Sequence, residues 1–104
     1  MKSIPYLTGK LYQKGGNVLM QQVNIKFNNV EQAVKFVDII NKFEVNFDLG
    51  SGNRVVDAKS ILGILALDLS EPLQLGYDSS DTRIIEKIAP FISKKPADQI
   101  LFNV

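Results

Sequence analysis

The chain has 104 residues, of which 45% are hydrophobic and 22% charged, so we expect one globular domain with a single core. Its net charge of +1 lacks the basic excess that nucleic-acid binding requires. The absence of Cys and His excludes thiolate nucleophiles, disulfides and imidazole catalysis. No apolar stretch approaches the ~18 residues of a membrane span. We therefore predict a cytoplasmic protein that is not an enzyme and has no cofactor, metal, nucleic-acid partner or membrane contact.

The first part of the chain differs from the rest, because Pro and Gly residues interrupt any regular pattern there. We divide the chain into an N-terminal extension (1–19), a domain (20–93) and a C-terminal tail (94–104). Codons for Lys14-Gly15-Gly16 can contain a ribosome-binding sequence at a workable distance before Met20. We therefore hypothesise that Met20 is the native start, and that the extension is a poorly packed translated leader.

The first regular pattern is an alternation of apolar and polar residues from Val23 to Phe27, which predicts a half-buried strand. Asn29 then stands where a helix N-cap is expected, with Gln32 three residues later as in a capping box. Apolar residues at helical spacing follow, so the pattern predicts a helix that runs to about Lys42.

The middle of the chain reads as a hairpin followed by a short helix. Residues 45–49 and 54–58 flank Gly-Ser-Gly-Asn at 50–53, and this arrangement is typical of two strands joined by a turn. Ser60 stands at an N-cap position ahead of an apolar segment that ends at Leu67. This segment predicts a short, mostly buried helix.

Alternation over residues 73–77 predicts a fourth strand, and Asp81 can cap a last helix that Pro90 should kink or end. In the tail (94–104), the apolar residues 100–102 are expected to dock on the domain or to pair with a sheet edge. A surface for a partner is the alternative for these three residues.

The order strand, helix, strand, strand, short helix, strand, helix favours an α+β sandwich. Together with the run from Asp57 to Leu67, which contains Lys-Ser-Ile-Leu-Gly, this order resembles HPr, the histidine-containing phosphocarrier of the bacterial sugar phosphotransferase system. The resemblance covers about residues 22–92. It implies an open-faced sandwich (βαββαβα), in which two longer helices and one short helix cover one face of a four-stranded, largely antiparallel sheet.

In the family, a Gly-x-His-x-Arg-Pro motif stands at the junction of the first strand and first helix. Counting back from Ser60 without gaps, the corresponding stretch here is Phe-Asn-Asn-Val-Glu-Gln at 27–32. Asn29 stands in the place of the phosphoryl-accepting His, and an amide is not nucleophilic. Glu31 stands in the place of the anion-holding Arg and would repel phosphate. Loss of both groups predicts a protein without phosphocarrier activity, in which Asn29 caps the helix.

The chain is also similar to HPr-like regulators that carry an amide residue instead of the His. In those proteins, phosphorylation of the family's regulatory serine promotes binding to a transcriptional regulator, which makes Ser60 the candidate here, with Lys59 close to the phosphate. We predict a partner surface made of Ile61, Leu62 and Ile64. Glu31 departs from this subset, because the family's Arg contributes to regulator binding. The alternative is a structural or assembly module, for example a homodimer, unrelated to sugar transport.

Two other clusters have a simple structural interpretation. Asp78-Ser79-Ser80-Asp81 lacks the further ligands of a calcium loop, so a turn and a helix cap are favoured over a metal site. Gly50 to Arg54 lacks the spacing of a nucleotide-binding loop, so a hairpin turn is favoured over an anion cradle.

Overall fold

A computed structural model of the protein describes residues 12–14 and 18–94. Within these residues, the strands are β1 (Tyr12–Lys14), β2 (Val18–Ile25), β3 (Phe47–Ser51), β4 (Arg54–Asp57) and β5 (Leu73–Tyr77). The helices are α1 (Val30–Ile40), α2 (Ile61–Leu65), α3 (Thr82–Ile88) and the 3₁₀ turn η1 (Ala89–Phe91). The predicted element order is therefore confirmed.

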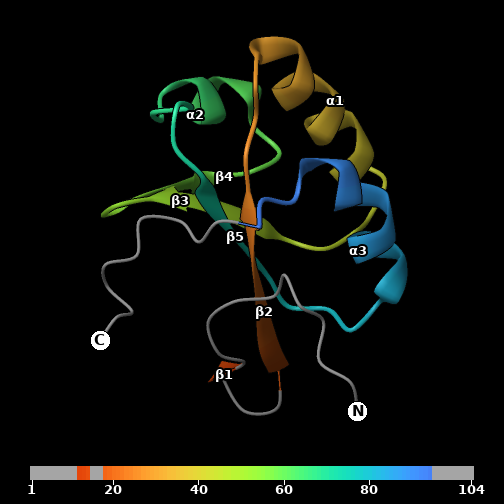
Figure 1. Ribbon diagram of the computed structural model, residues 1–104. Coiled ribbons are helices and arrows are strands. Elements are labelled where there is room, and N and C mark those ends of the chain that lie inside the picture. Colours follow the sequence, from red (N-terminus) through yellow and green to blue (C-terminus); the bar gives the residue numbers. More distant parts are fainter. Residues whose placement is uncertain (1–11, 15–17, 95–104) are drawn as a thin grey trace.

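The strands form one antiparallel sheet in the order β1-β2-β5-β3-β4. Figure 1 shows α1, α2 and α3 together on one side of this sheet. The predicted α+β open-faced sandwich is thus confirmed, with the four predicted strands and one short additional strand. The additional strand is β1, which pairs with the start of β2 at the sheet edge.

The start of the sheet differs from the sequence-based expectation. The strand expected from about Gln22 begins at Val18, and Gln13 of β1 pairs with Leu19. The proposed boundary before Met20 therefore falls inside β2, and part of the supposed extension belongs to the sheet. Whether Met20 is the native start remains a prediction.

The core lies between the sheet and the helices. From the sheet, Val23 and Ile25 are fully buried with the residues that face them across the strands, and α1 contributes Phe36 and Ile40. Phe27, Phe36 and Phe91 meet edge to face, with ring centroids 5.2–6.0 Å apart. Such edge-to-face pairs stabilise the core beyond the burial of their area.

Pro90 ends α3 as predicted, since the helix stops at Ile88 and η1 follows. The chain then turns back along β2, where Ile92 forms a bridge to Ile25 and the Lys26 N–H donates to the Phe91 carbonyl at 2.9 Å. This contact ties the end of the domain to its first long strand.

Candidate functional site

The junction of β2 and α1 is the place where the resemblance locates the phosphoryl acceptor. Asn29 has extended backbone angles, and its Oδ1 accepts from the Gln32 N–H at 2.9 Å. The Gln32 side chain returns through Oε1, which accepts from the Asn28 N–H at 2.8 Å. The predicted capping box therefore forms, with its return bond on Asn28, the residue before the cap. These side chains hold backbone donors that an anion would otherwise use.

Glu31 is exposed in the first turn of α1, and no ion pair involves it in the part of the chain that the structure describes. An acid in a first helical turn is stabilised by the helix dipole, so it suits this position without a partner. The same carboxylate places a negative charge beside any anion that approaches the helix start. The geometry here is that of a well-capped helix.

The junction of β4 and α2 contains the second candidate, Ser60. Its Oγ accepts from the Gly63 N–H at 3.1 Å, so Ser60 is the N-cap of α2. Gly63 lies close to β4, because a Cβ built on it would be 3.2 Å from the Val56 Cβ. The cap and this close approach together set the position of the short helix.

Lys59 was expected to lie close to a phosphate on Ser60, but its side chain makes contacts elsewhere. Its ammonium group donates to the Phe43 carbonyl at 2.8 Å and lies 5.7 Å from the centre of the Phe47 ring. This side chain thus links the residue before Ser60 to the loop after α1. The cation expected near a phosphate on Ser60 is engaged elsewhere.

The predicted partner surface of Ile61, Leu62 and Ile64 is only partly exposed. Leu62 is 77% exposed, Ile61 is half-buried against the core, and Ile64 is fully buried. A helix that lies on a sheet turns about one residue in three or four inward, and on α2 that residue is Ile64. Ile64 is therefore an anchor of the core, and its assignment to the surface was wrong.

Most of the exposed large apolar residues lie on two neighbouring helices. In the described part of the chain, five large hydrophobic residues are exposed, and four of these lie on α1 and α2, which contact each other (Figure 1). We call these four residues the α1–α2 face: Val30, Val34, Leu62 and Leu65. The fifth is Val55, on β4.

Sequence reasoning missed three members of this face. Val30 and Val34 belong to the apolar residues at helical spacing that follow Asn29, and Leu65 belongs to the apolar segment that follows Ser60. The sequence did contain a signal for this exposure, because α1 has more apolar residues than its contact with the core requires. The helix already buries Ala33, Phe36, Val37 and Ile40. An apolar stripe wider than its core contact leaves residues exposed.

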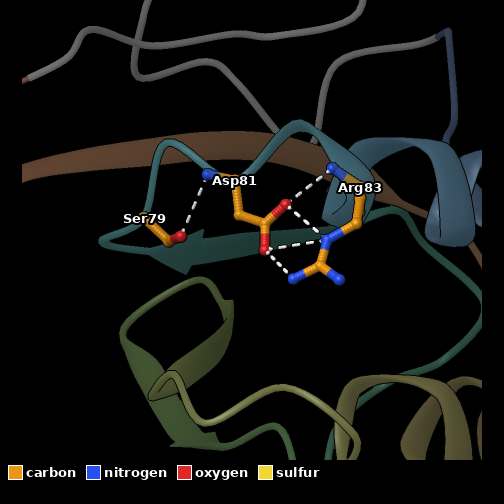
Figure 2. Close-up of polar contacts among 3 residues, drawn as sticks. All are labelled: Ser79, Asp81 and Arg83. Atoms are coloured by element: carbon orange, nitrogen blue, oxygen red, sulfur yellow. Dashed lines mark hydrogen bonds and ion pairs between the residues drawn. The ribbon is translucent and has the colours of Figure 1, made fainter.

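The start of α3 is held by a local network, drawn in Figure 2. Asp81 caps the helix by accepting from the Arg83 N–H at 2.9 Å, and its carboxylate pairs with the Arg83 guanidinium at 2.6 Å. The Asp81 N–H donates to Ser79 Oγ at 3.1 Å. The hydrogen bonds from the Arg83 side chain and backbone lower the pKa of Asp81 to about 2.

This network confirms the predicted helix cap at Asp81. The Arg83 guanidinium also lies 5.7 Å from the centre of the Phe43 ring, which connects α3 to the loop after α1. The hairpin prediction is likewise confirmed, because Ser51 pairs with Arg54 around Gly52, whose φ of 63° favours glycine.

Comparisons with known proteins define the fold class. No family model matches the sequence, and no curated protein matches it. A solved structure of a phosphocarrier protein HPr from Bacillus anthracis str. Ames is similar, with a TM-score of 0.56 and 23% sequence identity. The match covers 71% of this chain and 98% of that chain. The fold is therefore HPr-like, and the present chain contains residues beyond that fold.

Among the helices that the structure describes within residues 18–94, none is both long and apolar enough to span a membrane.

Proposed function

We propose that this protein is an HPr-like binding or regulatory protein of the cytoplasm, related to the sugar phosphotransferase system, that has no histidine phosphocarrier activity. The observation that carries the proposal is the α1–α2 face. Exposed apolar side chains cost free energy in water. Four of the five exposed large hydrophobic residues in the described part of the chain lie on these two contacting helices, which favours a surface that a protein partner covers.

The chemistry at the start of α1 supports the second half of the proposal. The Asn29 amide is occupied as a helix cap and has no basic or nucleophilic atom. Glu31 adds negative charge at the place where a carrier holds phosphate. Incubation with phosphoenolpyruvate and the first enzyme of the system should leave the chain unlabelled, and acid-labile phosphate on it would contradict the proposal.

Ser60 is the proposed regulatory residue. Its half-buried hydroxyl caps α2, and Leu62 stands two residues away on the α1–α2 face. A phosphate on Ser60 would add about two negative charges at the edge of this apolar surface and so change its choice of partner. Incubation with the serine kinase of the system tests this step: label on the wild type but not on Ser60→Ala is expected. Label that persists in the variant would identify another site.

The alternative function is a structural module that uses the HPr-like fold as a scaffold, with a homodimer as its simplest form. The exposed edge residue Val55 on β4 is the observation that favours it. Genes for phosphotransferase components beside this gene would support regulation, whereas their absence would favour the scaffold. A dimer that Val55→Ser dissociates would also favour the scaffold.

Affinity capture from the native cytosol tests the proposed binding surface, before and after treatment with the serine kinase. The wild type should capture a partner that Leu62→Ser loses. Val55→Ser is the matched control, because Val55 is 67% exposed but lies on β4, outside the α1–α2 face. Absence of any specific partner, or equal loss in both variants, would contradict the proposal.

A further inference from the structure

The polar residues that border the α1–α2 face on α1 are acids. On a helix, a side chain lies beside those three and four positions away, and not beside its immediate neighbours in the sequence. The exposed neighbours of Val34 are therefore Val30, Glu31 and Asp38. Both polar members of this set carry a negative charge.

The basic residues close to this face offset only part of that charge. Lys35 is exposed on α1, but no ion pair joins it to Glu31 or Asp38, and all three belong to the described residues. The ammonium group of Lys59, before α2, donates to the Phe43 carbonyl at 2.8 Å. Helix α1 thus carries two acids and one base, although the whole chain has a net charge of +1.

A third acid follows α2. Asp68 is exposed three residues after Leu65, and its Oδ1 accepts from the Ser70 hydroxyl at 2.6 Å and from the Ser70 N–H at 3.1 Å. These two hydrogen bonds lower the pKa of Asp68. They hold an ionised carboxylate close to the end of α2.

Asp38 stands where helix stability does not favour an acid. It lies in the last turn of α1, at the negative end of the helix dipole, and this turn contains no base. Glu31, by contrast, is stabilised by the dipole in the first turn. Residues that contradict a local stability rule tend to serve function. The Asp38 charge, which has no ion pair in the described part of the chain, therefore suits a group outside it.

We propose that the partner of the α1–α2 face presents apolar side chains flanked by Lys or Arg. This inference rests on the proposed binding function and specifies the chemistry of the partner. The apolar part meets the face, and Glu31, Asp38 and Asp68 attract the basic part. Such complementarity guides encounter and repels partners of the wrong charge. The apolar residues 100–102, the other predicted surface for a partner, lie outside the described residues and have no part in this proposal.

Two synthetic amphipathic helices with the same leucine positions test the sign of the charge, one with Lys and one with Glu at the polar positions. Calorimetry should show binding of the Lys peptide, which NaCl weakens by screening. The Glu peptide should bind at least about fivefold more weakly. The net charge of +1 would by itself favour the Glu peptide, so the expected order depends on the local charge. Equal binding, tighter binding of the Glu peptide, or no binding of the Lys peptide would overturn the proposal.

Charge reversal at single positions locates the contact. Asp38→Lys should weaken binding of the Lys peptide about fivefold. Its Tm should stay the same or rise, because an acid leaves the negative end of α1. Asp48→Lys is the matched control, since Asp48 is exposed on β3 opposite Asp57, and this change relieves a like-charge pair away from the face. Equal weakening by both variants, or a lower Tm for Asp38→Lys, would overturn the proposal.

Leu62→Ser separates this proposal from the binding function on which it rests. The variant should weaken binding of the Lys peptide, because Leu62 belongs to the α1–α2 face. If the Glu peptide binds more tightly and Leu62→Ser weakens it, the face binds partners but the basic partner is wrong. If Leu62→Ser binds both peptides as the wild type does, the peptides bind elsewhere, which would overturn the basic partner and contradict the binding face as well.

Discussion

The starts of α1 and α2 are built alike but differ in what surrounds them. At both, a side-chain oxygen accepts from the backbone N–H three residues later. Asn29 Oδ1 accepts from Gln32 at 2.9 Å, and Ser60 Oγ accepts from Gly63 at 3.1 Å. At α1 the Gln32 side chain closes the cap and Glu31 adds a negative charge. At α2 the cap lies beside the exposed Leu62. The two helix starts therefore share a cap but differ in the charge and the apolar exposure around it.

The largest expected effect on stability comes from comparing the buried and the exposed side of α2. Ile64→Ala should lower the free energy of unfolding by about 2–5 kcal/mol, because Ile64 is fully buried and its loss leaves a cavity. Leu62→Ala should change it by about 0.5 kcal/mol or less, since Leu62 is mostly exposed. Urea unfolding of both variants measures the difference, and similar losses would show that α2 is oriented differently.

The next largest effect on stability is expected where α2 packs closely on β4. Gly63→Ala would place a Cβ 3.2 Å from the Val56 Cβ, an atom attached directly to the backbone of β4. We expect overpacking, which costs about 1–3 kcal/mol, to outweigh the helical preference for Ala of about 1 kcal/mol. Thermal unfolding should therefore show a lower Tm for Gly63→Ala, and a higher Tm would mean that α2 lies further from β4.

The two caps should contribute about equally. Ser60→Ala and Asn29→Ala should each lower the free energy of unfolding by about 1 kcal/mol. Asn29→Asp should be nearly neutral, because Asp is as good a cap as Asn. Chemical denaturation distinguishes these cases. A loss at Ser60 without one at Asn29 would break the similarity between the two helix starts.

The third cap, Asp81, should give the smallest effect and depend on pH. Its pKa is lowered from 3.8 to about 2, so its stabilisation is present above pH 3.8 and is lost as the pH falls towards 2. When the pH is lowered from 3.8 to about 2, the Tm of Asp81→Asn should therefore fall less than the Tm of the wild type. The exposed Asp38, which has no ion pair among the described residues, provides the control variant Asp38→Asn. Equal acid sensitivity of wild type and Asp81→Asn would contradict the assignment.

Sequence patterns predicted the features of the fold that depend only on residues close together in the sequence. The alternation from Val23 to Phe27 and the caps Asn29, Ser60 and Asp81 were all visible, because strand period and capping are local. The strand β1 was missed because its three residues, which are followed by two glycines, are too few to show a period. Its pairing depends on β2, which no local pattern reports.

The candidate site was harder to predict because side-chain direction depends on tertiary contacts. Lys59 stands beside Ser60 in the sequence, yet its ammonium group bonds to Phe43, sixteen residues earlier. Ile64 and Leu62 both read as apolar residues of a short helix, and only the packing of α2 on the sheet separates them. The same holds for Val34, whose exposure depends on which side of α1 meets the core.

Binding affinity tests the role of the α1–α2 face most directly. Calorimetry with the captured partner should show that Leu62→Ser weakens binding at least about tenfold, as loss of an apolar anchor in an interface does. Val55→Ser should bind as tightly as the wild type. Unchanged affinity for Leu62→Ser, or the same loss for Val55→Ser, would contradict the assignment of the binding surface to α1 and α2.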